Sequence, residues 1–333
     1  MTTEQTSNQP TRRLGRNGPT VAPIGFGAMV LIDGMYGPVD ADAAVQQVQL
    51  AADLGAMIDT ADAYADNEDV IGRALADRSD SFVATKFGYT TPDDPNATRL
   101  EHNWAHELFA NGRPDRVREA AETSLRRLGR DVLDLWYLHI PDPAVPISET
   151  VGAMADLVDA GLVRHLGVSN VTPDQLVEAA AAGPVAVLQT EWSLWARDAE
   201  ADLIPTARQL GIGIVPWSPL GAGFLAGDVS AETAGADFRA NNPRFSDESL
   251  TANRDRFAPL RAIADREGLH PAQLALAWLV AQGEDVVPIP GTRSPDHLRS
   301  NLQAGKVQLS PDTVAEINQA AAPGTALGAT LLG

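Results

Sequence analysis

Three stretches of sequence decide the fold: AMIDTADAY (56–64), FVATKFG (82–88) and LDLWYLHI (133–140). Each contains a short, continuous apolar run, which is typical of a strand buried on both faces of a sheet. Polar groups follow near the carboxyl ends of these runs, and they are Asp59, Tyr64, Lys86 and His139. In a closed parallel barrel all carboxyl ends share one face, so the four side chains are predicted to converge there.

The strand-then-helix alternation continues along the whole chain. Strand candidates begin at Ile24, Ala56, Phe82, Leu133, Val163, Ala186, Gly213 and Val286. The segments between them have helical periodicity, and several start at an N-cap residue or Pro and stop at Gly. Eight such units favour an α/β fold of the (β/α)8 TIM-barrel type over a doubly wound sheet. Asn17-Gly18 predicts an N-terminal β-hairpin, and extra C-terminal helices are expected after residue 310.

The predicted domain organisation has a single folded unit. Residues 1–10 are polar and are expected to be a disordered tail, 11–325 form the barrel, and 326–333 form a flexible tail. The connections 89–113 and 221–255 are too long for bare loops. Both leave carboxyl ends of strands, where barrel enzymes build their substrate sites.

Composition excludes several classes of function. The 333-residue chain carries a net charge of −19, which argues against a nucleic-acid or anionic-membrane surface. Cys is absent, so disulfides, thiolate nucleophiles and zinc–thiolate sites are excluded. The start MTTEQTSNQPTRR lacks the apolar core of a signal peptide, and no apolar run reaches membrane-spanning length. A cytoplasmic location is therefore expected.

Lys86 stands out because only two of the 25 Lys and Arg residues are Lys. An ammonium adjusts its pKa, whereas a guanidinium is permanently charged. The Lys86 ammonium is expected to lower the pKa of the nearby Tyr64 phenol toward a range useful for proton transfer. Asp59 is expected to keep the ammonium charged. His139 adds a hydrogen-bond donor. This set suits a carbonyl whose oxygen gains negative charge on reduction, and the reducing equivalent must come from a cofactor.

The second half of the barrel supplies candidate cofactor groups. Ser169, Asn170 and Gln189 stand at strand ends, where amide side chains could pair with a carboxamide such as that of nicotinamide. Trp217 offers a flat face for a heteroaromatic ring, and residues 218–223 form a Gly-rich turn able to approach phosphates. After the eighth strand, Ser294 reads as an N-cap beside Thr292 and Arg293, and a helix start beside Arg is an anion site.

Taken together, these motifs resemble those of the aldo-keto reductases. The matching motifs, in order, are DTADAY, TKFG, LHI, GVSN, LQTEWSLW, WSPLGAGFL and IPGTRS, over roughly residues 11–307. The chain is most similar to bacterial NADP-dependent members, which are related to pyridoxal-reductase-like and potassium-channel β-subunit-like forms. The resemblance implies a barrel that binds a nicotinamide dinucleotide without a Rossmann fold and reduces a small carbonyl compound. It is compatible with a monomer or a homo-oligomer.

The resemblance also assigns roles to individual residues. Tyr64 is the general acid/base, Lys86 and Asp59 tune it, and His139 orients the carbonyl. The implied cofactor contacts are Ser169, Asn170, Gln189, Trp217, Ser218, Leu220, Gly221, Gly291, Thr292, Arg293, His297 and Asn301. Arg293 favours NADPH over NADH, because Gly291 to Arg293 would meet the 2′-phosphate. No metal is expected.

The chain departs from the family pattern at four cofactor positions. Trp217 replaces a frequent Tyr, and Ala222 replaces a frequent Arg of the phosphate loop. Ser300 stands where Glu is usual, and His297 where a cation is common. These changes bear on cofactor affinity and on the choice between NADP and NAD more than on the chemistry.

Substrate identity is predicted only as a class. The candidate pocket residues are Met29, Ile32, Phe87, Trp104 and Trp192. Their apolar and aromatic character suggests a moderately hydrophobic or aromatic carbonyl compound. Two other functions stay open: a cofactor-binding, redox-sensing regulatory subunit with weak or no turnover, and a metallohydrolase using Asp59 and His139. Each of the four polar residues taken alone has an ordinary structural role, and only their joint occurrence in matching motifs favours catalysis.

Overall fold

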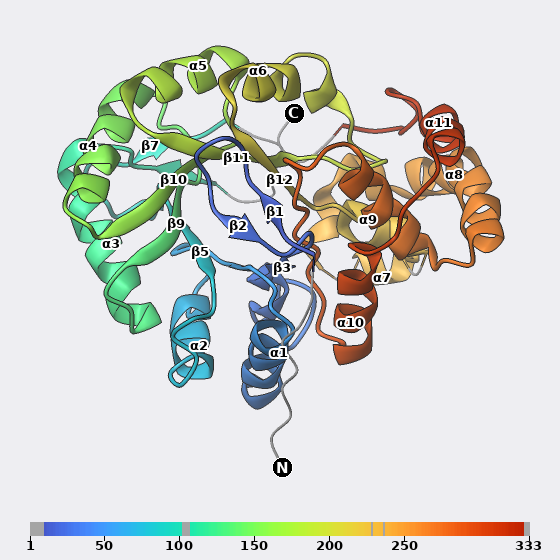
Figure 1. The fold of residues 1–333 in the computed structure, drawn as a ribbon, viewed down its shortest axis with the longest axis horizontal. Helices are drawn as coiled ribbons and strands as arrows, with labels where there is room; N and C mark the ends of the chain where they lie inside the picture. Colours follow the sequence, from blue (N-terminus) through green and yellow to red (C-terminus); the bar gives the residue numbers. More distant parts are fainter. Residues whose placement is uncertain (1–9, 102–106, 228, 236, 330–333) are drawn as a thin grey trace.

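The computed structural model describes residues 10–101, 107–227, 229–235 and 237–329. Seven parallel strands form one sheet in the order β12-β11-β10-β9-β5-β4-β3. Their bounds are β3 Phe26–Gly27, β4 Ile58–Asp59, β5 Val83–Phe87, β9 Leu133–Leu138, β10 Val163–Ser169, β11 Val185–Glu191 and β12 Gly213–Trp217. Figure 1 shows the helices surrounding this sheet. The predicted (β/α)8 TIM-barrel class is confirmed.

The eighth position of the barrel is occupied by residues 285–290, which form no regular strand in the structure. The N–H groups of Val287 and Ile289 donate to β12, to the carbonyls of Ile214 (2.9 Å) and Pro216 (3.1 Å). On the other side, the carbonyls of Pro288 and Pro290 accept from Gly25 (2.9 Å) and Gly27 (3.3 Å). Because Pro288 and Pro290 have no N–H, they accept hydrogen bonds from residues 25–27 but donate none in return. The barrel closes without a complete eighth strand.

Helices cover the outside of the barrel. Their bounds are α1 Ala41–Asp53, α2 Asn67–Ala74, α3 Pro114–Leu128, α4 Ile147–Asp159, α5 Pro173–Ala182, α6 Leu203–Leu210, α7 Ala231–Gly235, α8 Asp247–Glu267, α9 Pro271–Ala281, α10 Pro295–Ala304 and α11 Pro311–Ala320. The expected start and stop signals are present. A capping box between Thr172 and Gln175 starts α5, and Gly129 ends α3 in the left-handed conformation.

The predicted hairpin covers the amino-terminal end of the barrel. Strands β1 (Arg12–Arg13) and β2 (Thr20–Val21) pair antiparallel, and Figure 1 shows them lying across the barrel opening. Leu14 is fully buried in the barrel interior with residues such as Met57 and Leu135. The N–H of Arg16 donates to the carbonyl of Gly211 (2.7 Å). The hairpin therefore closes the end opposite to the strand tips.

The two long connections are structured at that other end. Residues 89–110 contribute a small antiparallel sheet of β6 (Tyr89–Thr90), β8 (Phe109–Ala110) and β7 (Thr98–Arg99). The second connection contains short helices: η3 Gly221–Ala226, η4 Phe238–Asn241 and η5 Pro243–Phe245. Two further 3-10 turns are η1 Ala28–Leu31 and η2 Asp198–Glu200.

The proposed division at residues 10 and 325 stays a prediction. Toward the carboxyl end, Asn253 donates to the carbonyl of Leu327 (3.0 Å) and accepts from its N–H (2.7 Å). Arg244 Nε donates to the carbonyl of Gly328 (3.0 Å). The described part of the predicted tail is therefore hydrogen-bonded to the body of the protein.

The packing of the hairpin predicts that substitution of Gly15 lowers the stability of the protein. Its φ is +69°, and an added Cβ would lie 2.4 Å from the Gly213 nitrogen. Gly268 has a similar φ of +67°, with no atom within 4 Å of its added Cβ. We expect Gly268→Ala to lower the free energy of unfolding by about 1–2 kcal/mol through φ alone. Gly15→Ala should lower it by about 1–3 kcal/mol more through backbone overlap. Chemical denaturation measures both, and equal losses would contradict this packing.

Candidate active site

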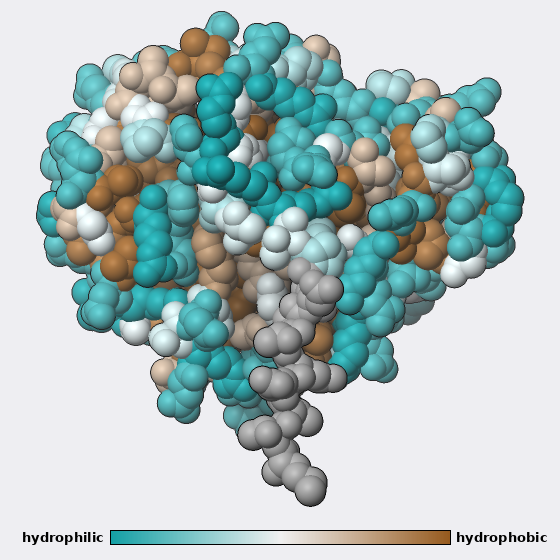
Figure 2. All heavy atoms as spheres, viewed as in Figure 1, coloured by the Kyte–Doolittle hydropathy of each residue, from teal (hydrophilic) through white to brown (hydrophobic). Residues whose placement is uncertain are grey.

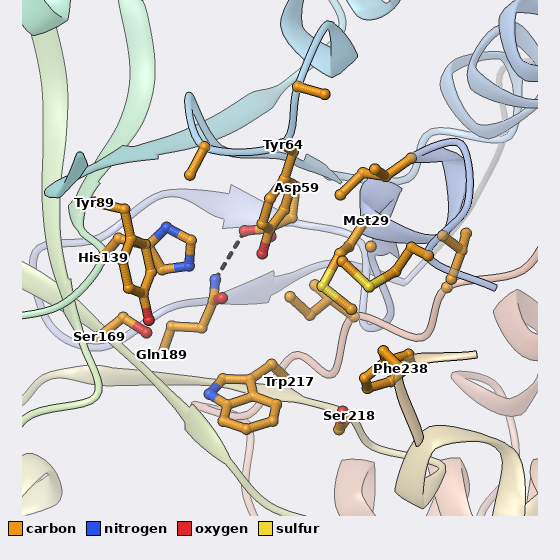
Figure 3. A pocket seen from close by; sticks show the side chains of 18 of the residues that line it. Met29, Asp59, Tyr64, Tyr89, His139, Ser169, Gln189, Trp217, Ser218 and Phe238 are labelled. Carbon is orange, nitrogen blue, oxygen red and sulfur yellow. Dashed lines mark hydrogen bonds between the residues drawn. The ribbon is translucent and has the colours of Figure 1, made fainter. Parts of the chain in front are cut away.

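A cavity of about 1640 Å³ opens at the carboxyl ends of the strands. Of the four residues that the sequence predicted to converge, Asp59, Tyr64 and His139 line it, and Lys86 lies buried beneath. Figure 3 shows Asp59 and Tyr64 on one side of the cavity and Trp217 on the other. The barrel thus brings together side chains that are up to 80 residues apart in sequence, because parallel strands end at one face.

The centre of the site is a buried ion pair. Lys86 Nζ donates to Asp59 Oδ1 (2.5 Å) and to the carbonyl of Thr60 (2.6 Å), and Lys86 is fully buried. Gln189 Nε2 donates to the second carboxylate oxygen of Asp59 (2.8 Å; Figure 3). Burial raises the pKa of Asp59, while the Lys86 charge and the hydrogen bonds from Lys86 and Gln189 oppose the rise.

Tyr64 and His139 meet above this pair. Their ring centroids lie 5.6 Å apart in an edge-on arrangement, and Lys86 Nζ lies 5.2 Å from the Tyr64 centroid. Burial and the Lys86 charge hold the pKa of His139 well below its usual range, so the imidazole is neutral. Its Nδ1 is buried and has no hydrogen-bond partner among the described residues.

The expected effect of Lys86 on Tyr64 is outweighed in this structure. Burial raises the pKa of the Tyr64 phenol far above its ordinary value, and the charges of Asp59 and Asp62 raise it further. The prediction that Lys86 lowers this pKa was therefore wrong for the net shift. The physical reason is that the phenolate would lose its hydration in a cavity that already holds two carboxyl groups. Tyr64 carries its proton.

A buried polar network fixes the loop that carries Tyr64. Thr60 Oγ1 donates to Asn67 (2.8 Å), and Asn67 donates to the carbonyl of Ala28 (3.2 Å). Thr85 Oγ1 donates to Glu68 (2.7 Å), which is also paired with Arg127 (3.3 Å). These bonds hold the start of α2 against the barrel, and they thereby fix the position of the loop that carries Tyr64.

The predicted cofactor residues at the other side of the cavity are tied to the catalytic side. Asn170 donates to the carbonyl of His139 (3.0 Å) and accepts from Trp217 Nε1 (3.2 Å). Ser169 Oγ is buried and unpaired within the part of the chain described. Gln189, predicted to meet a carboxamide, gives one N–H to Asp59 instead. The group can still offer its second amide hydrogen and its oxygen.

The predicted anion site lies at the start of α10. Ser294 caps this helix by accepting from the His297 N–H (3.3 Å). Thr292, His297 and Asn301 line the same cavity. Arg293 also lines it, and its guanidinium donates to the carbonyls of Tyr36 (2.8 Å) and Pro38 (2.9 Å). A phosphate there would have to use the remaining donors of Arg293.

Three sequence predictions need correction. Phe87 stacks on Trp136 with centroids 4.3 Å apart, because it follows the inward-pointing Lys86 and so faces the helices. Trp192 is also buried away from the cavity and donates to Glu200 (2.8 Å). Gly221 packs against Trp195 rather than lining the cavity.

The other predicted positions are in place, with one outside the described residues. The residues that line the cavity as expected include Met29, Ile32, Ser218, Leu220 and Gly291. Trp104 lies outside the residues that the structure describes. The functions assigned to these lining residues remain proposals.

Sequence reasoning missed several lining residues. Tyr89 stands edge-on to His139 with centroids 4.7 Å apart, and Met35 and Phe238 contribute apolar surface. Tyr89 follows the TKFG motif by one residue, which could have indicated it; Phe238 sits in a long connection with no local pattern. Asp62 also lines the cavity.

Comparisons with known proteins place the chain in a family. A model of the aldo/keto reductase family matches residues 23–322. The chain is 38% identical over 330 residues to a probable aldo-keto reductase of Glycine max, covering 97% of this chain and 92% of that protein. It is 37% identical to aldo-keto reductase yakc of Schizosaccharomyces pombe, whose name carries NADP(+), covering 96% and 94%. The chain therefore belongs to the aldo/keto reductase family.

Solved structures agree. The glycerol dehydrogenase of Gluconobacter oxydans superposes with a TM-score of 0.78 at 29% identity, covering 94% of this chain and 96% of that one. A thermostable aldo-keto reductase, solved with the inhibitor epalrestat, superposes with a TM-score of 0.72 at 28% identity, covering 94% and 100%. Carbonyl chemistry of an oxidoreductase is thus the class of function.

Two absences concern the described residues only. Within them, no three His, Asp or Glu side chains gather as a metal site would require. None of the helices in that part of the chain is both long and apolar enough to span a membrane.

The ion pair predicts how stability depends on Lys86. We expect Lys86→Met to lower the free energy of unfolding by about 3–5 kcal/mol at neutral pH, because Asp59 is left as an unpaired buried carboxyl group. In this variant Asp59 keeps its proton in the folded state, whereas in the unfolded chain it releases the proton at its ordinary pKa. The free energy of unfolding should therefore fall as pH rises above that ordinary pKa. Chemical denaturation across pH measures this loss.

The matched control is the double variant Lys86→Met/Asp59→Asn. Its neutral amide needs no proton in the folded state, so the double variant should be more stable than Lys86→Met alone and lose the added pH dependence. A double variant no more stable than the single one would contradict the assignment of the pair.

Proposed function

We propose that this protein reduces an aldehyde or ketone to the alcohol with NADPH. The observation that carries the proposal is the placement of Tyr64 beside His139 in one cavity, with ring centroids 5.6 Å apart, above the buried Lys86–Asp59 pair. A neutral imidazole and a phenol are both hydrogen-bond donors that can meet one carbonyl oxygen. The family membership supports the same class of reaction.

Each protein group has a distinct part in this reaction. The cofactor, when bound, supplies the hydride to the carbonyl carbon. His139 donates a hydrogen bond that orients the carbonyl oxygen, and Tyr64 gives that oxygen its proton. As Tyr64 loses the proton, the Lys86 ammonium 5.2 Å from the ring centroid stabilises the negative charge. Asp59 keeps the ammonium in place.

The residues present fit a nicotinamide dinucleotide. The unpaired Ser169 Oγ is a buried donor with room for a ligand partner, and Trp217 presents an aromatic face. At Gly291 an added Cβ would lie 2.6 Å from Val30 Cγ1 and 2.7 Å from the Gly27 carbonyl, so a glycine lets this segment pack against β3 and η1 while it lines the cavity. The start of α10 and Arg293 provide for phosphate.

NADPH is the favoured cofactor over NADH. Arg293 is a guanidinium at the mouth of the cavity, and His297 and Asn301 lie beside it. The name of the Schizosaccharomyces pombe relative points to the same cofactor. The missing Arg at Ala222 weakens the phosphate loop, which leaves Arg293 with a larger share of the binding.

The substrate side of the cavity is apolar and aromatic. Met29, Met35, Tyr36 and Phe238 form one wall, and Tyr36 and Phe238 meet edge-on with centroids 4.9 Å apart. Tyr89 lines the side near His139 (Figure 3). These surfaces suit a moderately hydrophobic or aromatic carbonyl compound.

The proton donor is tested by Tyr64→Phe. Without the hydroxyl, carbonyl reduction followed by NADPH absorbance should fall by about a hundredfold or more, because general acid catalysis contributes on that scale. NADPH binding, followed by fluorescence, should stay near the wild-type value. Full activity in Tyr64→Phe would refute the assignment.

Cofactor preference is tested by Arg293→Ala. Losing a charge-assisted contact should weaken NADPH binding by about ten- to a hundredfold and leave NADH binding nearly unchanged. Arg299→Ala, an exposed Arg on α10, serves as the control and should leave both dissociation constants unchanged. Equal weakening of NADPH and NADH by Arg293→Ala would instead indicate that Arg293 only holds residues 36–38 in place.

A further inference from the structure

One carboxyl group beside Tyr64 has no part in the chemistry described so far. Asp62 precedes Tyr64 by two residues in the same loop and lines the same cavity. Its backbone N–H donates to the carbonyl of Lys86 (3.0 Å), so the residue is anchored to the end of β5. Its charge acts on the phenol, since Asp62 is one of the two carboxyl groups that raise the pKa of Tyr64.

The Asp62 side chain is only partly shielded from solvent. Asp62 is partly exposed as a residue, yet its Oδ1 is shielded from solvent and has no hydrogen-bond partner among the described residues. Asp94, which lines the same cavity, differs: it accepts from Thr90 (2.8 Å) and Asn111 (2.8 Å). A buried carboxyl oxygen without a protein partner is costly unless water or another group uses it.

The cavity extends from Asp62 along one face of α3. The lining residues on that helix are Asp115, Arg116, Glu119, Ala120, Thr123 and Arg127, whose spacing places them on one face of the helix. Glu119 is exposed, so this branch reaches the surface of the protein. This branch is lined by α3, whereas Met29 and Trp217, which border the proposed substrate and cofactor sites, belong to η1 and β12.

Burial, together with the charged groups around it, brings the pKa of Asp62 close to neutrality. Glu68 faces it from α2, and Arg116 and Arg127 face it from α3. Burial raises the pKa of Asp62 to about 7, the charge of Glu68 adds to the rise, and the two guanidinium groups oppose it. A carboxyl group with this pKa is protonated below pH 7 and ionised above it, so it can both release and take up a proton.

We propose that Asp62 returns to Tyr64 the proton that Tyr64 gives up at each turnover, and draws its own replacement from solvent along α3. The inference rests on the proposed reduction. Tyr64 passes its proton to the carbonyl oxygen and becomes a phenolate. The Asp62 carboxylic acid then reprotonates the phenolate through water in the cavity and becomes a carboxylate. Solvent reprotonates Asp62, so one proton enters for each alcohol formed.

The first test separates proton supply from hydride transfer in Asp62→Asn, which keeps the shape but carries no exchangeable acid. In a single turnover Tyr64 starts protonated, so the rate should equal that of the wild type. In steady state, one pH unit above 7, kcat should fall by about tenfold or more, because general acid transfer contributes on that scale. Imidazole, a small diffusible acid, should restore kcat, and Asp62→Glu should retain it.

Asp66→Asn is the matched control, since Asp66 is an exposed carboxyl group in the same loop. It should match the wild type in both measurements. A steady-state kcat for Asp62→Asn equal to that of the wild type overturns the relay, and so does a single-turnover rate that falls together with kcat. If the wild type reduces carbonyls and Tyr64→Phe does not, such a result rejects the relay alone. If the wild type reduces none with NADPH, both proposals fail.

A second test needs no turnover. Infrared spectra of the cofactor-free protein should show the carbonyl stretch of a protonated carboxyl group one pH unit below 7, and lose it one unit above. Subtracting the Asp62→Asn spectrum should isolate this band, because Glu191, whose pKa burial also raises to about 7, contributes equally to both proteins. A difference spectrum without the band overturns the assignment of Asp62 as a proton carrier.

Discussion

The site depends on keeping one ammonium inside the barrel. A buried charge is tolerated only when its partners replace water, and Lys86 has both the Asp59 carboxylate and the Thr60 carbonyl at 2.5–2.6 Å. Asp59 in turn accepts a second bond from Gln189, which lies 130 residues further along the chain. Closure of the barrel brings these strands together. The fold therefore supplies the partners of the buried charge, and the bonds to that charge link the strands.

Part of the backbone that lines the cavity is strained. Four non-glycine residues among those described have positive φ, namely Ala65, Asn170, Ser218 and Ala222. All four line the cavity. Such conformations cost of order 1–3 kcal/mol each and persist only where surrounding bonds fix them. At Asn170 those bonds run to His139 and Trp217, so the turn that costs stability also connects the catalytic and cofactor sides.

The sequence was sufficient wherever a residue's place follows from strand period or from a motif. Apolar runs ending in polar groups predicted the barrel, and Asp59, Lys86 and His139 followed from their positions near strand ends. Phe87 was misplaced because the motif drew attention to its neighbour, whereas alternation puts it outside. The net pKa of Tyr64 depends on how deeply the loop is buried and on Asp62. Neither local propensity nor spacing encodes those two quantities.

The acidity of the chain explains why single cations matter so much at the cavity mouth. With a net charge of −19, the overall field opposes an anionic cofactor. Arg239, which is largely buried nearby, is already paired with Asp237 and bonded to the Ala222 carbonyl (3.0 Å). Among the described residues, the partners of Arg293 are backbone carbonyls, which do not compensate its charge. A phosphate is the kind of ligand that can neutralise this charge. Because Ala222 stands where a second cation is frequent, the proposed preference for NADPH depends on this one contact.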